Sequence, residues 1–147
     1  MGNILAMDLN HEAGYQFTAR FGGTVPDLLM DEPEPMGQGK GPSPDQLLGA
    51  AVANCLSASL IFALRKFKHE PFDFRTHAEV IQGRNQEGRL RIVQINVFIK
   101  LSEPASNFIH LDKALAQFEN FCTVTESIRQ CVPVKVTVQD GDGAVLK

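Results

Sequence analysis

The sequence predicts an α+β protein in which antiparallel sheets surround one long central helix. Apolar and polar residues alternate over 15–21 and again over 132–138, which is the pattern of strands with one buried face. Between these segments, residues 47–64 contain five alanines and no charged side chain. A helix that is apolar on all sides needs cover from sheets or from another subunit. The order of strands, helix, strands, helix and strand is that of an α+β fold.

The N-terminal segment is expected to form a small sheet followed by a loop. The strand over 15–21 ends at the glycine pair 22–23, and a short apolar segment, 27–30, pairs back on it. Residues 31–41 hold two prolines and three glycines, which break regular structure. We therefore expect a loop between this sheet and the long helix.

The start and end of the long helix are marked by local signals. Ser43 has the place of an N-cap, Pro44 is the first helical residue, and Gln46 completes a capping box with the serine. Pro71 cannot continue a helix, so we expect the end near 68–70.

The uncharged stretch 47–64 also has the length of a membrane span. Gly49, Asn54 and the serines 57 and 59 dilute its hydrophobicity, and no second span follows. We therefore interpret it as the core helix of a protein that does not enter a membrane.

The second half of the chain is expected to contain three strands and two helical segments. Strands over 72–82 and 89–101 are joined by a polar loop, and the apolar parity of the second strand switches near Ile92, which predicts a bulge. The remaining elements are an amphipathic helix over 108–118, helical turns over 123–129 with a capping box from Thr123 to Glu126, the strand over 132–138, and a turn at 141–143.

Length and composition exclude several classes of protein. A chain of 147 residues that is 44% hydrophobic is expected to form one domain over 1–147. Its net charge is −3, and its lysines and arginines are scattered, so the sequence does not predict the basic patch that a nucleic-acid-binding protein needs. The odd number of cysteines and the N-terminus, which does not resemble a secretory signal, predict a cytoplasmic location.

Two cysteines, Cys55 and Cys122, are the most informative residues. Neither lies in a close pair with another cysteine or histidine, so we expect no metal and no cofactor. Cysteine also packs in cores as a small hydrophobe. From the residues alone, both thiol chemistry and ordinary core packing remain open.

The segments that flank these cysteines resemble the OsmC/Ohr family of thiol-dependent hydroperoxide reductases. The first is Gly41-Pro42-Ser43-Pro44-Asp45-Gln46-Leu47-Leu48, before Cys55, and the second is Ser127-Ile128-Arg129-Gln130-Cys131-Val132-Pro133-Val134, after Cys122. The resemblance runs from about Tyr15 to Val138. It implies an OsmC-like fold, an intertwined homodimer, and an active site to which both subunits contribute.

The resemblance also assigns roles to individual residues. Cys55 matches the peroxidatic cysteine and Cys122 the resolving cysteine. Asp45 lies where the Ohr branch has a glutamate, in Ser43-Pro44-Asp45-Gln46, and Arg20 is the candidate for the arginine that lowers the pKa of the peroxidatic thiol and holds the peroxide. Ten residues of straight helix separate Asp45 from Cys55 by about 15 Å, so their side chains cannot touch directly.

The implied activity is a two-cysteine reduction of hydroperoxides, organic ones preferred, in a homodimer without a cofactor. The disulfide would join Cys55 and Cys122, because Cys131 lies nine residues beyond Cys122, about 13 Å away in a helix. The reductant would be an external dithiol, with a lipoyl protein as one candidate. The alternatives are a non-enzymatic OsmC-like protein that binds a small molecule, and a cysteine-based redox sensor.

Local physical chemistry and the resemblance disagree about which thiol attacks first. Cys122 precedes a short helix whose N-terminal dipole favours a thiolate, whereas Cys55 lies deep in a long helix where burial disfavours one. The resemblance names Cys55, and this assignment requires a nearby cation such as Arg20.

Overall fold

A computed structural model describes residues 2–71 and 73–147, which form two compact units, one up to Leu47 and one from Leu48 onward. Each unit is described by itself. The expectation of a single domain over 1–147 stays a prediction.

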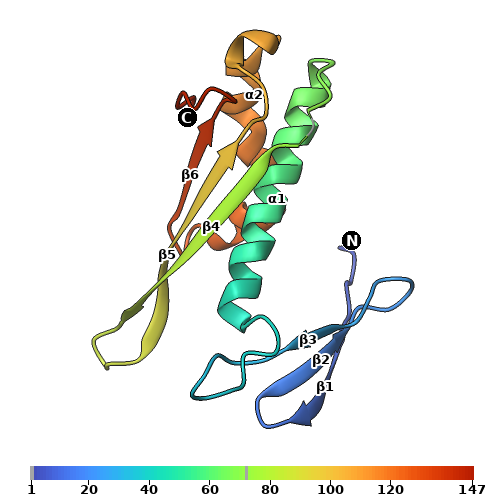
Figure 1. The fold of residues 1–147 in the computed structure, drawn as a ribbon, viewed down its shortest axis with the longest axis vertical. Coiled ribbons are helices and arrows are strands. Elements are labelled where there is room, and N and C mark those ends of the chain that lie inside the picture. The colour runs from blue at the N-terminus through green and yellow to red at the C-terminus, as the bar shows by residue number, and fades with distance from the viewer. Residues whose placement is uncertain (1, 72) are drawn as a thin grey trace. The chain divides into compact units, whose positions relative to one another are not determined.

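The N-terminal unit contains a three-stranded antiparallel sheet in the order β1-β2-β3 (Figure 1). Its strands are β1 (Asp8–Ala13), β2 (Gln16–Arg20) and β3 (Leu28–Met30). The pairing of β2 with β3 confirms the strand and the short segment that the sequence predicts. β1 was not predicted, because all six of its residues are exposed and burial therefore imposes no apolar alternation on them.

The expected loop over 31–41 is organised by the buried side chain of Asp31. Its carboxylate accepts hydrogen bonds from the backbone N–H groups of Glu32 (2.8 Å), Gln38 (3.1 Å) and Lys40 (3.2 Å). Burial acts to raise the pKa of Asp31, but these donors and Gln16 hold it below its ordinary value. At Gly41 a Cβ atom would lie 2.1 Å from the carbonyl oxygen of Leu29, so only glycine fits this close approach.

The long helix is α1 (Pro44–Lys66), and its N-terminus has the predicted capping box. Gln46 donates its backbone N–H to Ser43 Oγ (3.3 Å), and Ser43 donates its own to Gln46 Oε1 (2.9 Å). The helix ends two residues before the predicted 68–70. Lys68 has a φ of 61°, and the N–H of His69 bonds back to the carbonyl of Leu64, which is the geometry of a Schellman cap.

Among the described residues, α1 is the one helix long and apolar enough to cross a membrane by length and composition. One side of it is buried against the core of the C-terminal unit, as in a soluble core helix. The buried residues recur at helical spacing: Gly49, Val52, Leu56, Ser59, Leu60, Ala63 and Leu64.

The sheet of the C-terminal unit has the order β4-β5-β6, and the strands are β4 (Arg75–Arg84), β5 (Leu90–Lys100) and β6 (Val134–Gln139). β4 and β5 are antiparallel, and their register shifts where Ile81 faces Gln94 but the next residue faces Ile92. This irregularity confirms the predicted bulge near Ile92. β6 is parallel to β5, whereas the sequence predicts antiparallel sheets; the helices between the two strands form a crossover that returns the chain in the same direction.

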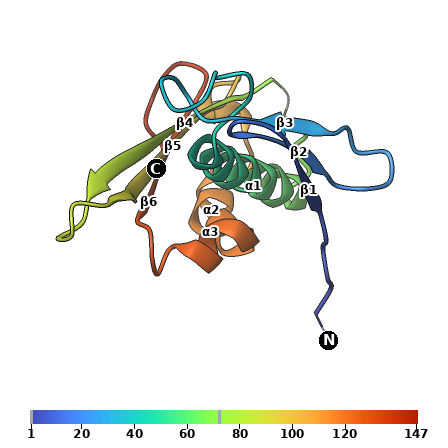
Figure 2. The ribbon, with the colours of Figure 1, turned by 90° about the horizontal axis from the view of Figure 1, so that it is seen from below.

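The crossover consists of short helical pieces. They are the 3-10 turn η1 (Ala105–Asn107), α2 (Leu111–Gln117), the 3-10 turn η2 (Phe118–Phe121) and α3 (Thr123–Ile128). The predicted helix over 108–118 is therefore shorter than expected, because His110, with a φ of 55°, stands before its first turn. α2 lies alongside α1 in two views of the unit (Figures 1 and 2), and Leu56, Leu115 and Phe118 belong to one core cluster.

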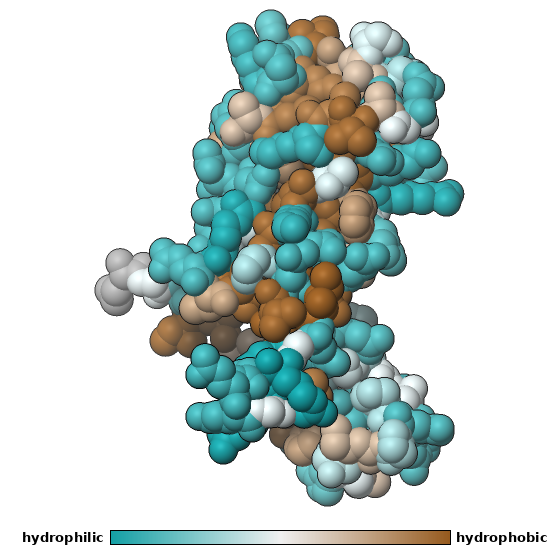
Figure 3. All heavy atoms as spheres, turned by 90° about the vertical axis from the view of Figure 1, so that its left-hand side faces the viewer, coloured by the Kyte–Doolittle hydropathy of each residue, from teal (hydrophilic) through white to brown (hydrophobic). Residues whose placement is uncertain are grey.

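Apolar side chains also remain at the surface. On the face drawn in Figure 3, hydrophobic residues form patches that hydrophilic residues interrupt. On α1, Phe62 is 50% exposed, and on β5, Phe98 is 40% exposed. The side of α1 opposite its buried residues is thus only partly covered by its own chain.

Candidate active site

The fold of the C-terminal unit brings Cys55 and Cys122 together from separate helical elements. Cys55 lies on α1 and is half-buried, and Cys122 stands immediately before α3 and is fully buried. The Cys55 side chain lies close enough to Cys122 to raise the pKa of its thiol, and both thiols are free. Cys131, which is exposed, is free as well.

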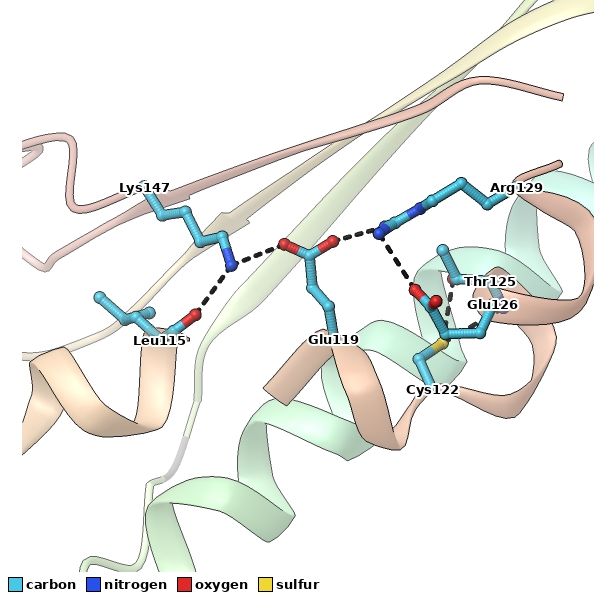
Figure 4. Close-up of polar contacts among 7 residues, drawn as sticks. All are labelled: Leu115, Glu119, Cys122, Thr125, Glu126, Arg129 and Lys147. Atoms are coloured by element: carbon cyan, nitrogen blue, oxygen red, sulfur yellow. Dashed lines mark hydrogen bonds and ion pairs between the residues drawn. The ribbon is translucent and has the colours of Figure 1, made fainter. Parts of the chain in front are cut away.

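Cys122 is the N-cap residue of α3 (Figure 4). Its Sγ accepts a hydrogen bond from the backbone N–H of Thr125 (3.4 Å), and the thiol donates to Thr125 Oγ1 over 2.9 Å. The predicted capping box that starts at Thr123 is therefore wrong, because the cysteine one residue earlier satisfies the helix N-terminus. A sulfur atom here has the place that serine or aspartate usually occupies.

The thiol of Cys122 is less acidic than the sequence argument expects. Burial raises its pKa, the neighbouring Cys55 side chain raises it further, and the two bonds with Thr125 only partly oppose this. Burial and the neighbouring thiol thus act against the helix dipole at Cys122. Which of the two thiols attacks first stays a prediction.

Cys55 opens onto an apolar groove of about 440 Å³, lined also by Ala58, Ser59, Phe62 and Phe121. The rings of Phe62 and Phe121 meet edge to face with their centroids 5.2 Å apart. Lys66 holds its Nζ 4.2 Å from the centre of the Phe121 ring. The groove thus offers a hydrocarbon surface beside a thiol, with a cation on its aromatic wall.

The other two predicted site residues belong to the N-terminal unit. Arg20 is the last residue of β2, has a side chain that is 59% exposed, and pairs with Asp27 (3.3 Å). Asp45 is half-buried in the first turn of α1. Cys55, on the same helix, belongs to the C-terminal unit. The roles of Arg20 and Asp45 stay predictions.

Sequence reasoning missed a charged cluster around Cys122 (Figure 4). Glu119 accepts from Lys147 Nζ (2.7 Å) and forms a close ion pair with Arg129, whose other nitrogen lies 3.0 Å from Glu126. Burial acts to raise the pKa of Glu119, but its bonds with Lys147 and Arg129 hold it below the ordinary value. The Glu119–Arg129 pair joins the two ends of the segment that carries Cys122.

The described part of the chain contains no group of three or more histidine, cysteine, aspartate or glutamate residues placed to hold a metal ion.

Residues 37–137 match the sequence profile of the family described as OsmC-like protein. The chain belongs to this family, which is associated with peroxidase activity. No curated protein matches the chain significantly in sequence.

Solved structures agree with this assignment. The chain is similar to an organic hydroperoxide resistance protein OsmC from Legionella pneumophila, with 19% identity, a TM-score of 0.72, and coverage of 93% of this chain and 98% of that one. It is similar to the organic hydroperoxide resistance protein OhrB of Bacillus subtilis, with 18% identity, a TM-score of 0.69, and coverage of 91% and 98%. An OsmC-like protein from Mycoplasma pneumoniae shares 13% identity, with a TM-score of 0.77 and coverage of 95% and 99%. At these identities the similarity establishes the fold, which is the predicted α+β OsmC-like fold.

Proposed function

We propose that this protein is a thiol-dependent peroxidase that reduces organic hydroperoxides with two cysteines. The observation that carries the proposal is the pair of neighbouring free thiols, Cys55 and Cys122, beside an apolar groove. Ordinary core packing accounts for a buried Cys122. Core packing gives no reason for a second thiol that lies beside Cys122 and also faces the groove.

In the proposed reaction the Cys55 thiolate attacks the terminal oxygen of the hydroperoxide and the O–O bond breaks. The alkoxide leaves, takes up a proton and becomes an alcohol, while Cys55 becomes a sulfenic acid. The Cys122 thiolate then attacks the sulfenic sulfur, and hydroxide leaves with a proton as water. An external dithiol, of which a lipoyl protein is one candidate, reduces the resulting disulfide by exchange.

The assignment of Cys55 as the attacking thiol is supported by exposure and by the state of its partner. Cys55 faces the groove, whereas Cys122 is fully buried and its pKa is raised. A thiol that stays protonated until its neighbour is oxidised suits the resolving role. Arg20 and Asp45 are proposed, from the family resemblance, to hold the peroxide and lower the pKa of Cys55.

The groove supports an alkyl hydroperoxide as substrate in preference to hydrogen peroxide. Ala58, Phe62 and Phe121 offer hydrocarbon surface to an alkyl tail, whose burial is favourable by about 25 cal/mol per Å². Hydrogen peroxide has no such tail and gains nothing from this surface.

We also propose that the protein acts as a homodimer in the cytoplasm. Apolar and small side chains of α1, among them Phe62, stay exposed opposite the buried side of the helix. A second copy would cover such a surface, and the family resemblance implies an intertwined dimer with shared active sites.

The test is to oxidise fully reduced protein with one equivalent of cumene hydroperoxide. We expect the loss of two thiols for each peroxide consumed, and a Cys55–Cys122 disulfide in the peptide map by mass spectrometry. A Cys131→Ser variant is the matched control and should behave the same. Unchanged thiols would refute peroxidase activity and leave the binding alternative, and a disulfide that contains Cys131 would overturn the assigned roles.

A further inference from the structure

We propose that Thr125 is a catalytic residue for the second step of this reaction, in which its hydroxyl and its backbone N–H bind Cys122 Sγ as that atom becomes a thiolate. The inference rests on the proposed function, because it concerns the resolving thiol of that reaction.

The geometry places two donors of one residue on one sulfur atom. Thr125 Oγ1 lies 2.9 Å from Cys122 Sγ, and the backbone nitrogen of Thr125 lies 3.4 Å from it. In the neutral state the thiol donates to Oγ1. When the proton leaves, the threonine hydroxyl can rotate and donate its own hydrogen to the sulfur, because a hydroxyl is both donor and acceptor.

Burial makes these two donors important. Cys122 and Thr125 are both fully buried, so no side of this contact is open to bulk solvent. A buried charge is costly unless it is hydrogen-bonded. The thiolate that attacks the sulfenic acid therefore needs the hydroxyl and the N–H of Thr125 at the moment when it forms.

The groups that act on Cys122 oppose each other. Burial and the Cys55 side chain, which faces it from α1, raise the pKa of the Cys122 thiol, and both bonds with Thr125 lower it. The charged groups of the same segment, Glu119, Glu126 and Arg129, pair with one another. Thr125 is thus the residue that the structure shows favouring the ionised form of Cys122.

If Thr125 had only a structural role, its substitution would have different effects from those expected for a catalytic role. If its side chain only fills space under α3, valine should replace it, because valine has nearly the same shape and lacks only the hydroxyl. If the hydroxyl stabilises the thiolate, valine should slow the resolving step and serine should restore it. Either substitution keeps the backbone N–H that Cys122 Sγ caps at the start of α3.

The first experiment follows a single turnover in a Cys131→Ser background by rapid mixing with cumene hydroperoxide. A sulfenic-acid probe and quenched mass spectrometry separate oxidation of Cys55 from disulfide formation. With Thr125→Val we expect an unchanged first phase and a second phase slowed about ten- to a hundredfold, the effect of one hydrogen bond to a charged group. With Thr125→Ser the second phase should return to within about threefold of the parent, an allowance for the context dependence of one hydrogen bond.

The second experiment needs no peroxide, so it separates failure of this inference from failure of the proposed function. In a Cys55→Ala, Cys131→Ser background, Cys122 is the remaining thiol, and the pH dependence of its alkylation reports its pKa. Thr125→Val should move that midpoint upward by about one pH unit or more, and Thr125→Ser should not. Thr125→Ala provides a second variant without the hydroxyl if valine disturbs folding.

An alkylation midpoint and a resolving rate that are the same in Thr125→Val as in the parent would overturn the inference. A slowed second phase in Thr125→Ser as well as Thr125→Val would also overturn it, because that result would assign the effect to packing. Circular dichroism and the unfolding midpoint of each variant show that it is folded under the conditions of both experiments.

Discussion

The charged cluster around Cys122 makes a quantitative prediction through Glu119→Gln. The carboxylate accepts from Lys147 Nζ at 2.7 Å and pairs closely with Arg129, and its own side chain is only 15% exposed. A hydrogen bond to a charged group contributes about 1.5–3 kcal/mol when buried, and an exposed ion pair about 0–1 kcal/mol. The side chains of Lys147 and Arg129 are 33% and 35% exposed. We therefore expect each of their interactions with Glu119 to contribute a free energy between these two ranges.

Glutamine keeps one acceptor oxygen but turns an NH2 group toward a cation. The free energy lost should therefore lie between the contribution of one buried bond and that of two exposed ion pairs. We expect the free energy of unfolding to decrease by about 2 kcal/mol. Arg129 adds to the cost, because its Nε is buried and lacks a hydrogen-bond partner among the described residues. Replacing the Glu119 carboxylate removes a negative charge from beside Arg129, whose guanidinium already lacks one hydrogen-bond partner.

Glu126→Gln is the matched control, because Glu126 pairs with the same arginine but its side chain is 44% exposed. We expect it to cost less than about 0.5 kcal/mol. The assay is urea unfolding of both variants and the parent at one protomer concentration, since assembly would make stability depend on concentration. Equal losses in the two variants, or a Glu119→Gln loss below about 0.5 kcal/mol, would refute the reasoning.

The pH dependence provides a second measurement on the same residue. The pKa of Glu119 is lower in the folded state than its ordinary value of 4.5, so the unfolded chain binds the proton more tightly. The stability that Glu119 contributes is therefore present above about pH 4.5 and is lost as the pH falls through the lower folded value. The difference in stability between the parent and Glu119→Gln should shrink over that acidic interval, whereas a constant difference would contradict the assignment.

Three further predictions test the roles and the assembly. Cys55→Ser should abolish peroxide consumption, whereas Cys122→Ser should consume one equivalent and trap a sulfenic acid on Cys55; label on Cys122 in the first variant would reverse the roles. Sedimentation at low micromolar concentration should show twice the chain mass of 16.2 kDa, and a stable folded monomer would exclude the shared active site. Ser43→Ala should lower the free energy of unfolding by about 1 kcal/mol, because it removes the cap of α1, while Ser43→Asp should keep most of it.

Local signals in the sequence were sufficient for most elements of the fold. The Ser43 and Gln46 pair marks the start of α1, and the parity switch near Ile92 marks the bulge between β4 and β5. Each signal involves residues that are close together in the chain, so it can be recognised without knowing the tertiary structure. β1 was not predicted because its residues are all exposed and show no alternation of apolar and polar side chains. The parallel pairing of β6 with β5 was not predicted because it depends on the crossover that precedes β6.

The sequence determined which residues could carry the chemistry, because cysteines 55 and 122 are recognisable by type and by the segments around them. It did not determine their acidity. The pKa of Cys122 depends on burial and on the contact with Cys55, and both arise only when α1 packs beside α3. The bonds from Thr125 and the pair between Glu119 and Arg129 likewise have no signature in spacing. Electrostatic and hydrogen-bond energies depend on distance and solvent access in three dimensions, so the tertiary structure alone decided how these thiols are held.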